Sequence, residues 1–321
     1  MKAVVARQYG TPDSLQVLDV DKPDVADDQV RVKVHAASLN GSDREMLQGW
    51  FLIRLSGLRR PNHEILGTDI AGTVEAVGRD VRQFEVGDEV LGELSGHGMG
   101  ALAEYAVAPE RALIRKPPGL TFEQAAAVPQ AGLLALQGVR DRGEVQPDQQ
   151  VLINGAGGGV GTFAVQLAKH YGAEVTAVDS EMKFEMLRAI GADHVLDYRQ
   201  EDFTRTGLRY DLILDVMSTR SAGDYLRALK SGGSYAMVGG SAPAVFRVVV
   251  LGALATRNRS ESIGLMLGTL TAPEDLTTLV ELIEAGTISP VIDRTYPLDE
   301  AAEAFRRLYD GSFLGKIVIT M

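Results

Sequence analysis

Residues 151–161 read V-L-I-N-G-A-G-G-G-V-G, and the ten residues after them, T-F-A-V-Q-L-A-K-H-Y, can continue as an amphipathic helix. An apolar run that ends in five glycines within seven positions predicts a strand, a tight turn and a helix start. Backbone N–H groups and the positive end of a helix dipole converge at such a junction, and glycine lets a phosphate approach the main chain closely. Alternatively, the glycines serve only to let the helix pack closely against the strand, without a ligand. We expect the turn to bind the pyrophosphate of a dinucleotide, through Gly158, Gly159, Val160 and Gly161.

The segments that follow this turn alternate between strand-like and helix-like patterns. Such alternation predicts an α/β fold with a doubly wound parallel sheet, the Rossmann arrangement. The expected elements are strands at 174–178, 194–197, 211–216 and 234–238, and helices around 183–190 and 226–229.

Asp179 ends the second strand of this series, 18 residues after Gly161 (179 − 161). A dinucleotide fold places the acidic residue that binds the adenosine ribose at about this distance. The alternative is that Asp179 caps the helix after it. An aspartate on the ribose repels the 2′-phosphate of NADPH, whereas Ser180 and Lys183 lie close enough in sequence to receive that phosphate. The local indications about NADH and NADPH therefore conflict.

The carboxyl edge of an open parallel sheet is where such folds bind ligands. Val216, Val238 and Gly239 stand at the ends of the later strands. We expect these three residues to lie beside the nicotinamide end of the dinucleotide.

Residues 1–120 show a different sequence pattern, in which short runs of alternating apolar and polar residues are separated by turn residues. This pattern is typical of a compact and mostly antiparallel β domain. Residues 121–261 are expected to form the Rossmann domain, beginning with two helices that meet near Pro129. The remaining block, 262–321, is too small to stand alone. We expect it to complete the first domain, so that the nucleotide-binding domain is an insertion.

Composition limits the classes of partner. The 321 residues have a net charge of −11, which argues against nucleic acid or an anionic membrane as a partner. The sequence has no cysteine, so disulfides, thiolate nucleophiles and cysteine-bound metals are excluded. Because the chain begins M-K-A-V-V-A, without a charged-then-apolar leader, we expect a cytoplasmic protein. The apolar stretch 244–256 is shorter than the ~20 residues that cross a bilayer and is expected to be core, pocket wall or subunit contact.

Several long motifs occur in a familiar order along nearly the whole chain. They are A-A-S-L-N-G-S-D (36–43), L-G-T-D-I-A-G-T-V-E-A-V-G (66–78), F-E-V-G-D-E-V (84–90), the glycine-rich turn, R-A-I-G-A-D-H-V-L-D-Y (188–198) and G-K-I-V-I (315–319). Together they resemble the medium-chain dehydrogenase/reductase superfamily, specifically its zinc-free quinone oxidoreductase branch. The resemblance implies a GroES-like β domain and a Rossmann domain. It also implies that a nicotinamide coenzyme, commonly NADPH, reduces quinones, enones or similar activated alkenes and carbonyls.

The resemblance also assigns individual residues. Asn40 matches an asparagine beside the nicotinamide, whose amide could donate to a developing oxyanion. Asp43 is a second catalytic candidate, although an aspartate in N-G-S-D could equally be a turn or cap residue. Tyr198 matches a tyrosine at the adenine-phosphate end, and Gly315 and Lys316 match a terminal pair near the coenzyme. On this basis NADP(H) is slightly favoured over NAD(H).

Two positions depart from the family pattern near the acceptor pocket. Leu134 stands where the family often has threonine, and Glu45 stands where some quinone reductases have tyrosine. The identity of the acceptor is therefore not transferable. Trp50 and Phe51 are candidates for an apolar pocket or for the core.

Zinc-containing relatives carry cysteine where Asn40 and Gln130 stand, and they resemble this chain around His63 and Glu64. A catalytic zinc needs about three good donors, which His63 and Glu64 alone do not provide. We therefore expect no zinc. Without a metal to acidify an alcohol, hydride delivery to an electron-poor acceptor is the favoured direction.

Two other functions stay open. One is a dinucleotide-binding protein with little turnover, acting as a sensor or interaction partner, and the other is a metal-dependent alcohol dehydrogenase. For the favoured reductase, we expect a small electrophilic substrate and a homodimer, because sheets of this family often pair through an edge strand.

Overall fold

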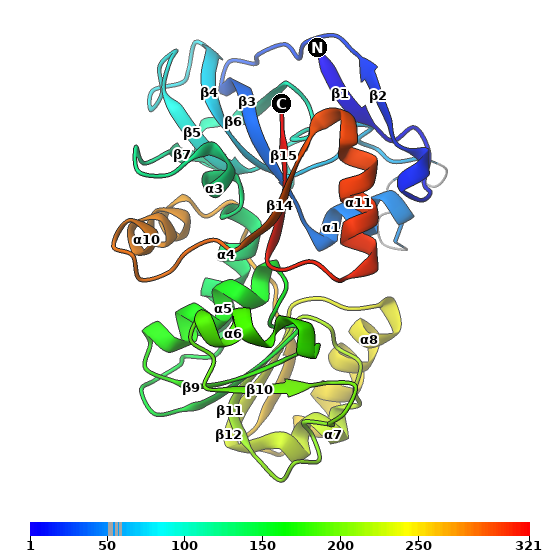
Figure 1. Ribbon diagram of the computed structural model, residues 1–321, viewed down its shortest axis with the longest axis vertical. Helices are drawn as coiled ribbons and strands as arrows, with labels where there is room; N and C mark the ends of the chain where they lie inside the picture. The colour runs from blue at the N-terminus through cyan, green and yellow to red at the C-terminus, as the bar shows by residue number, and fades with distance from the viewer. Residues whose placement is uncertain (51–53, 55–56, 58–59) are drawn as a thin grey trace. The chain divides into compact units, whose positions relative to one another are not determined.

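Two large sheets of different kinds organise the chain, and each belongs to its own unit (Figure 1). The structure, a computed structural model, describes residues 1–50, 54, 57 and 60–321. The candidate pocket residue Phe51 lies outside the described residues, and Trp50 is half-buried.

The second unit, residues 134–269 and 287–289, is built on a six-stranded sheet in the order β10-β9-β8-β11-β12-β13. Every neighbouring pair in this sheet is parallel, which confirms the predicted α/β class. The strands are β8 (Gln150–Asn154), β9 (Glu174–Asp179), β10 (His194–Asp197), β11 (Tyr210–Asp215), β12 (Leu229–Met237) and β13 (Ser262–Leu265).

Helices connect these strands, and α5, which follows the glycine-rich turn, packs against β8 and β9. The longer apolar side chains of the strands form the core with Phe203, Tyr225 and Val248. The helical segments are η3 (Gln137–Arg142), α5 (Gly159–His170), η4 (Glu181–Lys183), α6 (Phe184–Ala189), α7 (Ala222–Ala228), α8 (Ala242–Phe246), η5 (Arg247–Gly252) and α9 (Ala253–Thr256).

Two sequence expectations about this unit need correction. Strand β13 was not predicted, and it lies beyond the expected boundary at 261 because four residues between polar segments give too short a pattern. Leu229 begins β12 instead of ending α7. The apolar stretch 244–256, expected to be core, pocket wall or subunit contact, includes exposed side chains, since Phe246 is 63% and Leu254 is 65% exposed.

The first unit comprises residues 1–133, 270–286 and 290–321. Its seven-stranded sheet has the order β14-β15-β3-β4-β5-β7, with β6 paired to β3, and β1 and β2 form a separate hairpin. The strands are β1 (Lys2–Val5), β2 (Gln16–Asp19), β3 (Gln29–Leu39), β4 (Asp69–Val77), β5 (Glu89–Glu93), β6 (Tyr105–Pro109), β7 (Leu113–Arg115), β14 (Ile292–Pro297) and β15 (Lys316–Thr320).

The C-terminal strand joins this sheet beside a strand from the start of the chain, because β15 pairs with β3 in antiparallel register. Helix α3 packs on β3 and β4, so residues 121–133 lie in this unit, whereas the sequence placed a boundary at 120. The helical segments are η1 (Pro12–Ser14), α1 (Gly41–Gln48), η2 (Glu110–Ala112), α3 (Phe122–Ala126), α4 (Pro129–Leu136, which crosses into the second unit), α10 (Pro273–Glu284), η6 (Leu298–Glu300) and α11 (Ala301–Asp310).

Helix α1 follows β3 directly, and the junction places Asn40 at the end of a central strand. The Asp43 carboxylate accepts the Asn40 N–H at 2.8 Å, which satisfies one of the unpaired donors at the helix start. Gly49, in the left-handed conformation with φ of 66°, ends the helix. None of the helices within the described ranges is long and apolar enough to span a bilayer.

Substitution of two glycines in the turn tests its packing. A Cβ at Gly161 would lie 2.3 Å from the Gly155 carbonyl oxygen, whereas a Cβ at Gly158 would meet no atom closer than 3.6 Å. We predict that G161A lowers the free energy of unfolding by about 1–3 kcal/mol, while G158A changes it by less than about 1 kcal/mol. Urea unfolding followed by circular dichroism measures both, and equal effects of the two substitutions would contradict this packing.

Candidate functional site

The glycine-rich turn lies at the carboxyl edge of the parallel sheet. Strand β8 ends at Asn154, Gly158 precedes α5, and Gly159, Val160 and Gly161 form the first turn of that helix. Gly158, Gly159 and Val160 are only half-buried, so a ligand can reach the helix start. The first N–H groups of a helix have no partner within it, and together with the helix dipole they favour an anion.

Asp179 is bound by groups of its own chain. Its carboxylate accepts the Gly157 N–H at 2.8 Å and the Ser180 N–H at 2.8 Å, and it forms an ion pair with Lys183 at 3.3 Å. Asp179, Ser180 and Lys183 are all buried. Asp179 therefore ties the glycine-rich turn to the end of β9, and its expected contact with a ribose stays a prediction.

The other candidates of this unit follow strand ends at the same edge. Val216 comes directly after β11, where its N–H donates to Asn154, and Tyr198 follows β10 with half of its surface exposed. Val238 and Gly239 follow β12. The parallel register of the strands brings these residues to one edge, as predicted for a ligand-binding edge.

Sequence reasoning missed Asp215, which organises this edge. Its fully buried carboxylate accepts the Asn154 amide at 2.8 Å, the Ser218 N–H at 2.7 Å and the Tyr235 hydroxyl at 3.0 Å. The loop after β11 is thereby held against β8 and β12. Its signal in the sequence was an aspartate at the end of an apolar strand, the same signal that drew attention to Asp179.

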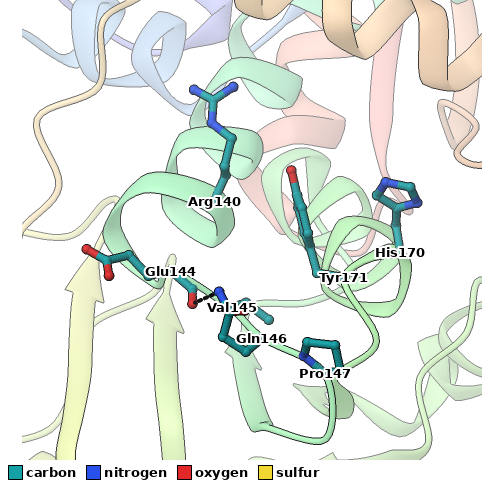
Figure 2. Close-up of a pocket in the computed structure, with 7 residues that line it drawn as sticks. All are labelled: Arg140, Glu144, Val145, Gln146, Pro147, His170 and Tyr171. Carbon is teal, nitrogen blue, oxygen red and sulfur yellow. Dashed lines mark hydrogen bonds between the residues drawn. The ribbon is translucent and has the colours of Figure 1, made fainter.

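A surface hollow occurs in the same unit, but at the other edge of the sheet (Figure 2). Arg140, Glu144 and Gln146 lie before β8, and His170 and Tyr171 lie at the end of α5. These are the amino ends of strands and the carboxyl end of a helix, where the negative end of the helix dipole disfavours an anion. We therefore do not place the dinucleotide in this hollow.

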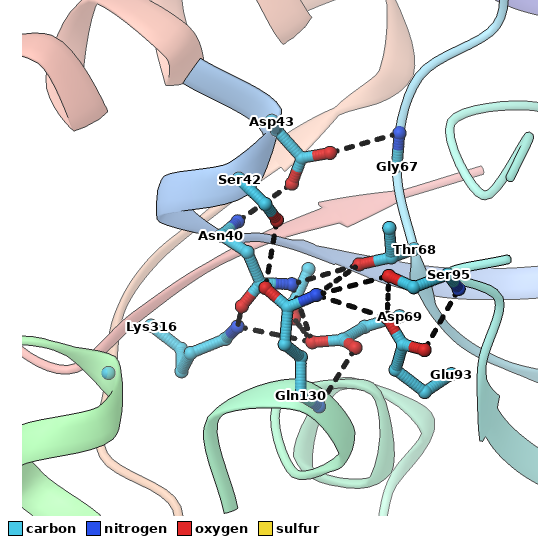
Figure 3. A network of polar contacts seen from close by, with 12 residues as sticks. Asn40, Ser42, Asp43, Gly67, Thr68, Asp69, Glu93, Ser95, Gln130 and Lys316 are labelled. Atoms are coloured by element: carbon cyan, nitrogen blue, oxygen red, sulfur yellow. Dashed lines mark hydrogen bonds and ion pairs between the residues drawn. The ribbon is translucent and has the colours of Figure 1, made fainter. Parts of the chain in front are cut away.

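The first unit contains a buried polar cluster around Asn40 (Figure 3). The ammonium of Lys316, at the start of β15, donates to the Asn40 side-chain oxygen and to Asp69 at 3.2 Å. Asp69 also accepts the Ser38 hydroxyl at 3.0 Å and the Gln130 N–H at 3.0 Å. Lys316 is 2% exposed and Asp69 is fully buried, so the structure holds an ion pair away from water.

In this cluster the side-chain amide of Asn40, expected to donate to an oxyanion, already donates within the protein. Its amide nitrogen donates to Thr68 at 3.2 Å and to Asp69 at 2.9 Å, which uses both amide hydrogens. With its oxygen facing Lys316, the amide is fixed in one orientation. Lys316 belongs to this cluster, and its expected place near the coenzyme stays a prediction. Gly315 before it turns with φ of 68° beside Val291.

Asp43 and Glu93 are the two carboxyl groups with the most perturbed acidity in this cluster. Asp43 is fully buried and accepts the N–H groups of Asn40 and Gly67, as a capping residue does; burial raises the pKa of Asp43 to about 7. Glu93 accepts the Gln130 amide at 3.0 Å and both donors of Ser95. Burial, with the nearby charge of Asp69, raises the pKa of Glu93 to about 7.

The donor set does not fit a zinc ion. Gln130 and Asn40, which stand where zinc-containing relatives have cysteine, both point an amide N–H₂ at the Thr68 hydroxyl. The oxygens of Asn40 and Asp69 face the ammonium of Lys316. Amide donors and a resident cation disfavour a second cation at this place.

His63 and Glu64, which the sequence analysis weighed as metal ligands, lie elsewhere. Both are exposed, and Glu64 faces Arg60 at 4.0 Å. The residues beside Asn40 and Gln130 are Thr68 and Asp69 instead. In the part of the chain that the structure describes, no three histidine, cysteine, aspartate or glutamate side chains gather as a metal site.

Leu134 and Glu45, the two departures from the family pattern, lie in different units. Leu134 is half-buried and packs toward Gly268 in the second unit. Glu45 lies on α1, where burial raises its pKa.

Comparison with protein families gives two matches. A profile described as "Alcohol dehydrogenase GroES-like domain" matches residues 26–118, and one described as "Zinc-binding dehydrogenase" matches residues 190–319. The first range falls in the β-rich unit described above.

Two curated proteins are similar over almost the whole chain. The chloroplast envelope quinone oxidoreductase homolog of Arabidopsis thaliana is 32% identical, with 99% of this chain and 98% of that protein covered. The chloroplastic NADPH-dependent alkenal/one oxidoreductase of Arabidopsis thaliana is 34% identical, with 99% of this chain and 79% of that protein covered.

Two solved structures share the fold over the full length. The quinone oxidoreductase of Coxiella burnetii has a TM-score of 0.89 and 31% identity, with 100% of this chain and 99% of that chain covered. The Escherichia coli quinone oxidoreductase, solved in complex with NADPH, has a TM-score of 0.87 and 27% identity, with 100% of both chains covered.

Removal of the buried ammonium tests the ion pair. K316M leaves the carboxylate of Asp69 buried without its counter-ion, so we predict a loss of about 3–5 kcal/mol in the free energy of unfolding. K2M breaks the exposed pair of Lys2 with Asp299 and should cost less than about 1 kcal/mol. Urea unfolding compares the two variants, and equal costs would contradict the pairing of Lys316 with Asp69.

The raised pKa values of Asp43 and Glu93 predict how stability changes with pH. Unfolded aspartate and glutamate lose their protons near pH 4, whereas Asp43 and Glu93 in the folded chain retain theirs to about pH 7. The folded state therefore binds more protons between these values, and its stability falls as the pH rises through this window. We predict a shallower fall for E93Q than for the natural chain in urea unfolding at pH 5, 6, 7 and 8. Parallel curves for the two proteins would contradict the raised pKa of Glu93.

Proposed function

Because the chain belongs to the quinone oxidoreductase branch of the medium-chain dehydrogenase/reductase superfamily, we propose that it is an NAD(P)H-dependent reductase. Its substrates would be quinones, enones or similar small molecules with activated C=C or C=O bonds. The observation that carries the proposal is the half-buried start of α5 directly after the glycine-rich turn. Helix starts of this kind bind the pyrophosphate of dinucleotides.

In this proposal the residues of the turn, Gly158, Gly159, Val160 and Gly161, bind the pyrophosphate. The nicotinamide end lies along the ends of β11 and β12, at Val216, Val238 and Gly239. When bound, a reduced nicotinamide supplies the hydride, while the protein orients it and excludes water. Asp179 and Asp215 contribute by holding the two loops of this edge in place.

We assign the acceptor side to Asn40. Asn40 is 7% exposed, whereas its hydrogen-bond partners Thr68 and Asp69 are fully buried. The ammonium of Lys316 is hydrogen-bonded to the Asn40 oxygen and polarises the amide, which strengthens its N–H groups as donors to a developing oxyanion once one of them leaves Thr68. Asp43 is fully buried, so it acts as a positioning residue that holds the Asn40 backbone.

We propose that the reaction needs no zinc. The support is the chemistry of the donor set, in which amide groups and the ammonium of Lys316 stand at the place expected for the metal of zinc-containing relatives. In this proposal the positive charge near the acceptor comes from the side chain of Lys316 and not from a metal ion.

NADP(H) is proposed as the coenzyme by a small margin over NAD(H). One relative is named as NADPH-dependent, and one structural neighbour was solved with NADPH. A homodimer is also proposed, since β13 is an edge strand and Phe246, Val249 and Leu254 are exposed apolar side chains near it. A cytoplasmic location stays a prediction, and the two curated relatives named above are chloroplastic proteins by name.

Stopped-flow oxidation of NADPH tests the reductase against the dinucleotide-binding alternative. We expect coenzyme absorbance to decay only when an acceptor from a panel of quinones and enones is added. Treatment with a zinc chelator should leave the rate unchanged. Binding of NADPH without acceptor-dependent decay would favour a binding protein with little turnover, and loss of activity in chelator would favour a metal-dependent enzyme.

A further inference from the structure

The ends of β9 and β10 form a small charged region beside the glycine-rich turn. The two strands are parallel, and Asp179 is the register partner of Asp197. The residues just past these ends, Lys183 after β9 and Tyr198 and Arg199 after β10, therefore share the carboxyl edge of the sheet. This edge is where a dinucleotide fold holds the adenosine ribose.

Lys183 is not available to an incoming anion. Its side chain is 6% exposed, and its ammonium is paired with Asp179 at 3.3 Å. Its methylene groups pack so closely over Gly157 that a Cβ at Gly157 would lie 2.3 Å from Lys183 Cδ. Taking this ammonium to a phosphate would leave the carboxylate of Asp179 buried without its counter-ion, which is costly.

Arg199, in contrast, is exposed at the same edge. Its backbone N–H donates to Asp197 at 2.9 Å, and its guanidinium donates to the Tyr198 hydroxyl at 3.3 Å. The hydrogen bond to Tyr198 raises the pKa of Arg199, and the charges of Asp197 and, to a smaller extent, Asp179 add to this shift. Arg199 thus interacts electrostatically with Asp179, the carboxylate that accepts the Gly157 N–H of the turn.

Resting on the proposed function, we propose that Arg199, and not Lys183, binds the 2′-phosphate that distinguishes NADPH from NADH. A guanidinium presents a planar set of donors that matches a phosphate. The pair of Asp179 with Lys183 stays closed with either coenzyme and serves to fix the turn. The preference for NADPH is modest, because one exposed arginine attracts the phosphate while the carboxylate of Asp179 remains nearby.

Coenzyme titrations on the full chain test this assignment. The probes are NADPH, NADH and 2′,5′-ADP, with dissociation constants measured by fluorescence or calorimetry. We expect R199Q to weaken NADPH and 2′,5′-ADP about tenfold, as for one charge-assisted phosphate contact, and to leave NADH unchanged. R199K should retain part of the affinity. R227Q, which removes another surface arginine of the same unit, on α7, should bind all three probes as the natural chain does.

K183M provides the opposing comparison. Because Lys183 supports the turn, its loss should weaken NADH and NADPH by the same factor. The assignment is overturned if K183M weakens NADPH alone, or if R199Q leaves the ratio of NADPH to NADH affinity unchanged. Failure of the natural chain to bind either coenzyme would overturn the proposed function itself, a result that differs from both of these.

Discussion

A lysine ammonium buried against a carboxylate holds the first unit together at the cluster around Asn40. Lys316 and Asp69 come from the start of β15 and the start of β4, and both contact Asn40 at the end of β3. Neither charge is stable away from water without the other, so the pair can form only when the C-terminal strand has joined the N-terminal sheet. The same pair fixes the orientation of the Asn40 amide. The pairing of β15 with β3 therefore also positions Asn40, the residue proposed on the acceptor side.

The second unit uses buried carboxylates in a related way. Asp179 ends β9 and Asp215 ends β11, the two strands that flank β8 in the parallel sheet. Each carboxylate accepts backbone N–H groups from a loop at the carboxyl edge. Such bonds to a charged acceptor are stronger than neutral ones and shape the loops before any ligand arrives. Rigid loops reduce the entropy that binding costs. An acidic residue at a strand end can thus serve the coenzyme site through the protein's own backbone.

The sequence was a good guide to several features whose signal was local, although it missed Asp215 and β13. The glycines of the turn, the strands around them and the cap formed by Asp43 follow from short patterns, because the residues that interact are neighbours in the chain. The cluster around Asn40 was only partly foreseen. Asp69 meets Asn40 through the pairing of β3 with β4, in which Ser38 is the partner of Asp69, and no local pattern reports that register. His63 and Glu64 were weighed as metal ligands because zinc-containing relatives resemble the chain there, and both are exposed. Lys316 was expected near the coenzyme from the family resemblance, which gave no sign of its pairing with Asp69.

The most direct measurement follows the hydride itself. NADPH carrying deuterium at the transferable position of the nicotinamide is incubated with an enone and chelator-treated protein, and the product is analysed by mass spectrometry. We predict one deuterium in the reduced product, with a yield that does not depend on added zinc. A product without deuterium, or a reaction that proceeds only after zinc is restored, would contradict metal-free hydride transfer by this chain.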